Sequence, residues 1–289
     1  MLRLAKDLLR PLYGRVGGQT ARAYFSRHER ARRLLSRSQR LFDGIYDSYW
    51  SGIVPNRDLA ERGEWFDRIA SDGICIVPGY VDSATVDALR RELEALPGFH
   101  DGSYDGPIRH KHLVDDGIFA LEVTDALPVA ARLSQSDTAV ASLARALYGA
   151  DIHLTATTVL HKYNPERIDS SNVPHWDDWR ARFKAFLYVT DVGEENAPML
   201  YVKGSHKAPF SWRRDKDFAS LFLPTASAGG SWWPVEQLGL GKVSCLGPAG
   251  TLVLFDALGI HAGTQLRGSP RTMLMSMYTT HIPFGFRPY

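Results

Sequence analysis

Features that would assign this chain to several familiar protein classes are scarce or absent. Cysteine occurs only twice, at Cys75 and Cys245, and Cys75 lies inside an apolar run, which argues against a disulfide-stabilised secreted domain. No apolar run approaches the roughly 18–20 residues of a membrane-spanning helix. The N-terminus also lacks the apolar core and small-residue cleavage site of a signal peptide. These absences favour a cytoplasmic protein.

Charge is distributed unevenly along the chain. Residues 1–40 contain ten arginines and Lys6 against Asp7 and Glu29, a net charge of +9, so the remaining residues carry −7 of the chain's net +2. We predict that residues 1–50 form a basic helical N-terminal extension with leucines recurring on one face. Residues 51–289 are long enough for one large domain with its own core.

The basic extension admits several interpretations. Its leucine face could pack on the main domain, or residues 1–40 could bind anionic lipids and hold the protein against the inner face of a membrane. An arginine-rich transit peptide is a third interpretation. Nucleic-acid binding is least favoured, because the basic segment lacks a recognised module. We therefore predict no nucleic-acid partner.

The main domain begins with helices and then becomes rich in strands. The spacing of its apolar residues predicts three helical regions, at 55–71, 83–96 and 128–148. Apolar alternation and strand-forming residues predict strands at 74–77, 152–163, 184–189 and 273–278. Polar residues 98–118 are predicted to be a loop. Several strands at short spacing favour an antiparallel barrel or jelly roll. We expect a mainly β fold of the α+β class, with flanking helices.

Three side chains suit a metal ion. Residues i and i+2 of an extended strand face the same side, so His175 and Asp177 can present an imidazole and a carboxylate to one point. His261 could add a third ligand from a neighbouring strand. Two histidines and one carboxylate form the facial set that leaves three positions open on non-haem Fe(II). A zinc hydrolase or a non-catalytic binding module with a structural metal could use the same ligands, and these alternatives stay open.

A candidate anion-binding residue follows the third metal ligand. Arg271 lies ten residues after His261, in a following β-like run that includes residues 273–278. A guanidinium can bind a carboxylate through two parallel hydrogen bonds. We therefore expect Arg271 to bind a carboxylate cosubstrate.

From about Asp72 to the C-terminus, the chain resembles the phytanoyl-CoA dioxygenase-like family of Fe(II)/2-oxoglutarate-dependent oxygenases. Asp72-Gly-Ile-Cys-Ile-Val-Pro-Gly-Tyr-Val-Asp82 resembles the family's opening strand, which leads into a capped helix. The segment Ala197-Pro-Met-Leu-Tyr-Val-Lys-Gly-Ser-His206 resembles its central signature, with Ala197 and Lys203 in place of the usual Gly and Pro. Gly250-Thr-Leu-Val-Leu-Phe-Asp256, followed by His261, matches the strand and turn that deliver the distal ligand.

The resemblance implies a double-stranded β-helix that uses Fe(II), 2-oxoglutarate and O2. It implies that His175, Asp177 and His261 hold iron and that Arg271 binds the far carboxylate of 2-oxoglutarate. Trp176 stands where the family often has Gln. The halogenating relatives lack the acidic ligand, so the presence of Asp177 favours hydroxylation.

Further residues are expected to line the cosubstrate and substrate pockets. Lys184, Phe186 and Tyr188 share one strand face and are assigned to the cosubstrate pocket. Residues 207–240 do not read as a strand and are predicted to form a lid or insertion. Aromatic and basic residues near the first ligand and in this insertion would suit a small polar or anionic substrate; they are Trp176, Trp179, Arg180, Trp232 and Trp233.

Overall fold

The computed structural model describes residues 29–113, 117–164, 172–177, 180–207 and 239–280. The chain divides into two compact units, one with helix α3 (Glu29–Ser51) and one with all the strands given below. In α3, Phe42 and Tyr46 lie one helical turn apart, are both buried, and have ring centroids 5.8 Å apart. None of the described helices is long and apolar enough to span a bilayer. Residues 1–28 of the predicted extension lie outside the described part of the chain.

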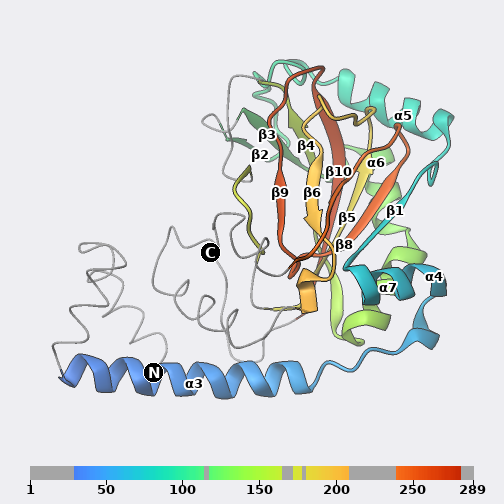
Figure 1. The fold of residues 1–289 in the computed structure, drawn as a ribbon. Helices are drawn as coiled ribbons and strands as arrows, with labels where there is room; N and C mark the ends of the chain where they lie inside the picture. The colour runs from blue at the N-terminus through green and yellow to red at the C-terminus, as the bar shows by residue number, and fades with distance from the viewer. Residues whose placement is uncertain (1–28, 114–116, 165–171, 178–179, 208–238, 281–289) are drawn as a thin grey trace. The chain divides into compact units, whose positions relative to one another are not determined.

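The larger sheet has seven strands in the order β1-β8-β5-β10-β4-β3-β2 (Figure 1). Every neighbouring pair is antiparallel. The central strand β10 pairs with β4 and β5, and its Met273 lies opposite both Leu160 and Tyr188, so these side chains share one face of the sheet. The strands are β1 (Ile74–Val77), β2 (His110–Leu113), β3 (Ile118–Glu122), β4 (Ile152–Lys162), β5 (Arg182–Tyr188), β8 (Leu252–Asp256) and β10 (Arg271–Thr280).

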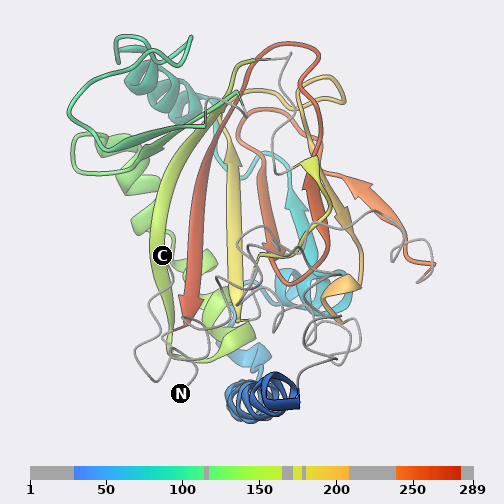
Figure 2. The same ribbon diagram turned by 90° about the vertical axis from the view of Figure 1, so that its left-hand side faces the viewer.

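A smaller sheet lies across from the larger one (Figures 1 and 2). It has the order β7-β6-β9, with β6 (Met199–Val202), β7 (Lys242–Ser244) and β9 (His261–Gly263). Apolar side chains from both sheets form one buried cluster, to which Tyr188 and Phe255 come from the larger sheet and Tyr201 from the smaller one. This two-sheet core agrees with the predicted jelly roll, and the predicted mainly β fold with flanking helices is confirmed.

Helices cover the opposite face of the larger sheet (Figure 1). Helices α6 (Pro128–Gln135) and α7 (Thr138–Tyr148) contact β4, and α4 (Gly63–Asp72) contacts β1 and β8. Helix α5 (Ser83–Glu94) begins at the predicted cap, because the Asp82 carboxylate accepts a hydrogen bond from the Thr85 N–H at 2.9 Å. With both faces covered, every residue of β8 is buried, which explains its continuous apolar run.

Some predicted elements have different bounds in the structure. The predicted helix 55–71 is a short 3-10 turn, η1 (Arg57–Leu59), followed by α4, and the region 128–148 divides into α6 and α7. The prediction of a loop over 98–118 is wrong for residues 110–113, which form β2, and for Ile118, the first residue of the neighbouring strand β3. The polar sequence of β2 has weak strand propensity, and its pairing with the edge of β3 overrides that propensity. Within the predicted insertion 207–240, residues 208–238 lie outside the described residues.

Candidate metal centre

His175 and Asp177 lie on an extended segment that pairs with the chain leading into β9. The His175 N–H donates to the His261 carbonyl at 2.9 Å, and the His261 N–H donates to the His175 carbonyl at 2.8 Å. The Asp177 N–H donates to the Ala257 carbonyl at 3.1 Å. Antiparallel residues that exchange both hydrogen bonds lie directly opposite each other, with side chains on one face. This backbone pairing brings the three predicted ligands together.

A tight turn delivers His261. The Asp256 carboxylate accepts the Leu258 N–H at 2.8 Å, and the Asp256 carbonyl accepts the Gly259 N–H at 3.0 Å. The Tyr201 hydroxyl donates to the same carbonyl at 2.9 Å. A Cβ atom at position 259 would collide with this hydroxyl, so the turn requires glycine there. The position of His261 is therefore closely fixed by its backbone.

Both histidine rings are oriented through the same atom. Nδ1 of His175 lies 2.7 Å from the Val173 carbonyl, and Nδ1 of His261 lies 2.8 Å from the Gly259 carbonyl. A carbonyl oxygen only accepts hydrogen bonds, so we assign the proton of each neutral ring to Nδ1. Each Nε2 then keeps its lone pair, and histidine ligands in metal sites are held in this way.

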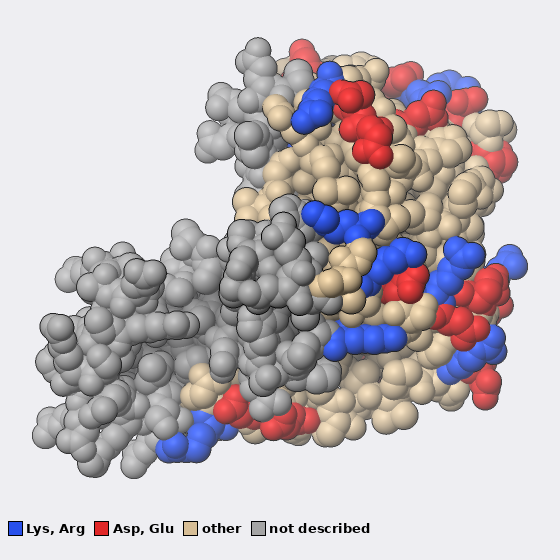
Figure 3. All heavy atoms as spheres, in the orientation of Figure 1, with Lys and Arg blue, Asp and Glu red and all other residues tan. Residues whose placement is uncertain are grey.

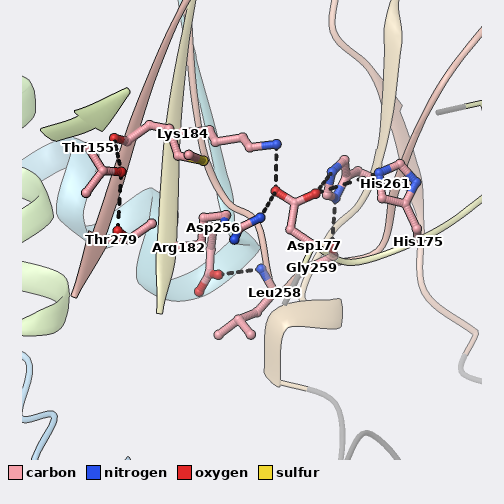
Figure 4. A network of polar contacts seen from close by, with 11 residues as sticks. Thr155, His175, Asp177, Arg182, Lys184, Asp256, Leu258, Gly259, His261 and Thr279 are labelled. Atoms are coloured by element: carbon pink, nitrogen blue, oxygen red, sulfur yellow. Dashed lines mark hydrogen bonds and ion pairs between the residues drawn. The ribbon is translucent and has the colours of Figure 1, made fainter. Parts of the chain in front are cut away.

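The two carboxylate oxygens of Asp177 face different partners (Figure 4). Its Oδ1 lies 3.8 Å from Nε2 of His175 and 3.6 Å from Nε2 of His261. Its Oδ2 lies 2.6 Å from the Lys184 ammonium and 3.6 Å from the Arg182 guanidinium. One oxygen thus faces the histidines and the other faces two cations.

The surroundings favour the forms of these groups that bind a metal. Burial alone would raise the pKa of Asp177, but the charges of Lys184 and Arg182 act against it, and this pKa is held well below its usual range. Burial, together with a smaller effect of the nearby His261, lowers the pKa of His175 to about 4. At neutral pH, Asp177 is ionised and His175 is neutral, as metal binding requires.

The donor set fits a metal ion. The ligand atoms of His175, Asp177 and His261 all lie within 4.8 Å of one another. Two imidazole nitrogens and one carboxylate oxygen suit non-haem Fe(II), and they also suit Zn²⁺.

Arg271 lies at the start of β10, two residues before Met273 of the core. Residues i and i+2 share a strand face, so both side chains face the space between the sheets. The Arg271 side chain is buried, and its guanidinium donates to the Ala197 carbonyl. Ala197 has a φ of 55°, in the left-handed region that glycine adopts more easily. Ala197, which replaces the family's usual Gly, therefore has a strained backbone, and its carbonyl accepts the hydrogen bond from Arg271.

The other predicted cosubstrate residues line the same inner face. Phe186 and Tyr188 belong to the buried core cluster, and the Tyr188 hydroxyl donates to the Cys245 carbonyl at 2.7 Å. Burial raises the pKa of Tyr188 above its usual range, so the phenol stays protonated. Lys184 lies four residues before Tyr188, toward the other end of β5, and there it contacts Asp177.

The residues assigned to the substrate pocket are either buried or outside the described chain. Trp176 is 4% exposed and Arg180 is 8% exposed, so neither offers an open surface in this structure. Trp179, Trp232 and Trp233 lie outside the described residues. The substrate roles of all five stay predictions.

Two supporting residues were not predicted from the sequence. The Ser205 hydroxyl accepts the Ile260 N–H at 2.7 Å and donates to the Val202 carbonyl at 2.7 Å, which ties the turn before His261 to the end of β6. Arg182 lies two residues before Lys184 and joins it beside Asp177. Ser205 belongs to the recognised signature, but no feature of the sequence indicates its contact with Ile260.

The two-sheet core and the His-x-Asp…His set define the class of iron-dependent oxygenases built on a double-stranded β-helix. Residues 69–273 match the phytanoyl-CoA dioxygenase (PhyH) family, and the chain belongs to this family of Fe(II)/2-oxoglutarate-dependent oxygenases. The resemblance seen in the sequence is thereby confirmed. A comparison with curated proteins gave no match.

Solved structures with the same fold include two enzymes of nogalamycin biosynthesis. The epimerase SnoN, solved with Fe3+, alpha ketoglutarate and nogalamycin RO, is 22% identical with a TM-score of 0.57, over 77% of this chain and 86% of that one. The carbocyclase SnoK is 19% identical with a TM-score of 0.52, over 78% and 87%. HygX from Streptomyces hygroscopicus, with nickel, 2-oxoglutarate and hygromycin B, is 19% identical with a TM-score of 0.51, over 78% and 89%.

Proposed function

We propose that this protein is an Fe(II)- and 2-oxoglutarate-dependent dioxygenase that hydroxylates a C–H bond of a small polar or anionic molecule. His175, Asp177 and His261 would hold the iron, and Arg271 would bind the far carboxylate of 2-oxoglutarate. When bound, the metal and the keto acid supply the oxidising chemistry, with O2 as the oxidant. The protein's own residues orient these groups and keep water away from them.

The observation that carries this proposal is the arrangement of the three ligand atoms. Each imidazole points Nε2 toward Oδ1 of Asp177, and each ring is already held by a backbone carbonyl. Each residue offers one ligand atom, so a bound Fe(II) would keep positions open for the keto acid and O2. The acidic ligand, which the halogenating relatives lack, favours hydroxylation.

Arg271 supports the cosubstrate assignment. It lies on the inner face of the larger sheet, near Tyr188 at one end of β5. Phe186 and then Lys184 follow on the same face toward the other end of that strand. A buried guanidinium is well suited to bind a carboxylate, because its planar fork of N–H groups matches the two carboxylate oxygens.

The substrate would lie against the half-exposed part of the inner face. Met275 and Met277 of β10 and Thr158 of β4 are only partly buried there. A cavity of about 540 Å³ adjoins this part of β4, and Thr155 and Glu122 are among its lining residues. The mixture of hydroxyl, carboxylate and apolar groups suits a small polar molecule. The bound molecules of SnoN and HygX, nogalamycin RO and hygromycin B, are small-molecule precedents on the same fold.

We also propose that the protein acts in the cytoplasm and does not bind nucleic acid. On the face shown in Figure 3, acidic and basic side chains of the described residues are interspersed. Nucleic-acid binding would instead favour a continuous basic surface. Peripheral membrane contact through residues 1–40 stays a prediction, because residues 1–28 lie outside the described chain.

The proposal is tested by adding Fe(II) and then 2-oxoglutarate to the apoprotein without oxygen. A weak visible charge-transfer band is expected, because the keto acid chelates the iron. His175→Ala and Asp177→Asn should lack the band while retaining the circular dichroism spectrum of the native fold. Bound iron without a band would contradict the oxygenase assignment and favour a hydrolase or a binding module.

The same band tests the role of Arg271. In Arg271→Ala, we expect half-saturation to need about 10–100 times more 2-oxoglutarate, because a charged hydrogen bond contributes about 1.5–3 kcal/mol. Iron affinity should change little. Arg267→Ala is the matched control, since Arg267 is exposed and lies four residues away in the chain. Loss of cosubstrate affinity in the control alone would move the role to Arg267.

A further inference from the structure

We propose that Lys184 is a positioning residue of the metal centre: its ammonium holds the outer oxygen of Asp177, so that the carboxylate binds the metal through one oxygen only. Arg182 assists it from the same strand. This inference rests on the metal centre proposed above, and it assigns Lys184 to Asp177 rather than directly to 2-oxoglutarate.

The contact is short and selective. The Lys184 nitrogen lies 2.6 Å from Oδ2 of Asp177, and a nitrogen of Arg182 lies 3.6 Å from the same oxygen (Figure 4). The two histidine nitrogens lie on the Oδ1 side, at 3.6 and 3.8 Å. Two opposite charges this close and largely shielded from water attract each other strongly. The cations therefore hold Oδ2, and Oδ1 is the oxygen that faces the ligand nitrogens of the histidines.

Both cations, Lys184 and Arg182, come from β5, an inner strand of the larger sheet. Lys184 and Arg182 are alternate residues of β5 and share its inner face. In the register, Lys184 lies opposite Met277 of β10 on one side and Phe255 of β8 on the other. Its side chain is 14% exposed, and that of Asp177 is 9% exposed. A cation anchored in the sheet thus fixes a ligand that comes from an irregular segment.

The orientation of Asp177 decides how many coordination positions stay open. A carboxylate bound through Oδ1 takes one position, whereas a carboxylate bound through both oxygens takes two. Turning Oδ2 toward the metal would require it to leave the Lys184 ammonium. The ion pair therefore opposes two-oxygen binding and preserves the positions that a chelating keto acid and O2 need.

The test is a titration of the apoprotein with Co²⁺ in the absence of 2-oxoglutarate, followed by the visible d–d absorption of the bound ion. In Lys184→Met, we expect Co²⁺ affinity about 10–100-fold weaker, as is typical when the partner of a ligand is removed, and a changed d–d spectrum. Lys184→Arg should restore the affinity and the spectrum toward wild type. Arg182→Met should have a smaller effect than Lys184→Met, because Arg182 lies farther from Oδ2.

Lys203→Met is the matched control, because it breaks a more exposed lysine–carboxylate pair, the 3.0 Å contact with Asp72. It should leave both readings unchanged. Native Co²⁺ affinity and spectrum in Lys184→Met would overturn the proposal, and if only 2-oxoglutarate binding were then weakened, Lys184 would bind the cosubstrate directly. If Lys184→Met does not fold, native readings in Arg182→Met together with strongly altered readings in Lys184→Arg would overturn it. Failure of the wild-type protein to bind Co²⁺ would instead contradict the metal centre itself.

Discussion

The two histidine ligands reach the metal centre on segments of different character. His261 follows a turn whose residues are all buried, and its own side chain is 6% exposed. His175 has a side chain that is 20% exposed, and the Val173 residue that orients it is 44% exposed. Each ring is nevertheless held in the same way, by the carbonyl two residues before it.

This difference suggests a division of roles. The His261 segment is fixed by packing and hydrogen bonds within the fold, so it provides a constant reference for the metal. The His175 segment is joined to it through the exchanged backbone hydrogen bonds, and its exposed side faces outward. We expect changes on the His261 segment to affect both stability and metal binding, and changes on the His175 segment to affect metal binding alone.

The largest effects should come from removing the rings themselves. His261→Ala should abolish metal binding and lower the free energy of unfolding by about 2–4 kcal/mol, because the buried ring packs near Tyr201 and Phe255. His175→Ala should also abolish metal binding but cost about 1 kcal/mol or less. Denaturant unfolding of the metal-free variants measures the difference, and equal losses would contradict the division of roles.

Gly259→Ala should have the next largest effect. The new Cβ would collide with the Tyr201 hydroxyl, so the turn or the tyrosine must move, at a cost of about 1–3 kcal/mol. Displacement of the Gly259 carbonyl should also turn the His261 ring and weaken metal binding. Unfolding and Co²⁺ titration measure the two effects.

Gly44→Ala in α3 is the control for a glycine that lies in open space. Among the described residues, no atom outside the helix's own backbone lies within 4 Å of a Cβ at position 44, and alanine favours a helix, so stability should be unchanged or slightly raised. Native metal affinity in Gly259→Ala would show that the turn can adjust without moving the ligand.

Ser205→Ala should have a smaller effect on metal binding. It leaves the Ile260 N–H without the acceptor that the structure shows, at a cost of about 1–3 kcal/mol. Because the backbone of the turn keeps its other hydrogen bonds, metal affinity should fall less than in Gly259→Ala. A loss of metal affinity as large as in Gly259→Ala would mean that the end of β6, rather than the turn, positions His261.

Local patterns in the sequence predict the parts of the site that depend on neighbouring residues. The same-face placement of His175 and Asp177 follows from strand alternation, and so does the shared face of Lys184, Phe186 and Tyr188. The helix start at Asp82 follows from its capping side chain. These features need no knowledge of the tertiary structure.

Contacts between distant segments could not be predicted in this way. The ion pair between Lys184 and Asp177 depends on how a loop meets the face of β5, and strand alternation alone placed Lys184 only in the general region of the pocket. The need for glycine at position 259 arises from Tyr201, which lies on another strand. The strand β2 depends on the edge of β3 rather than on its own polar sequence.

The smallest effect is expected from Val173→Ala, the counterpart of Gly259→Ala on the other segment. Position 173 is exposed, and the substitution keeps the carbonyl that orients His175. The free energy of unfolding should change by less than about 0.5 kcal/mol, and Co²⁺ affinity should stay native. A marked loss of metal affinity would show that the valine side chain, and not only its backbone, fixes the His175 segment. The two segments would then be equally constrained, and the exposed side of His175 would no longer distinguish it from His261.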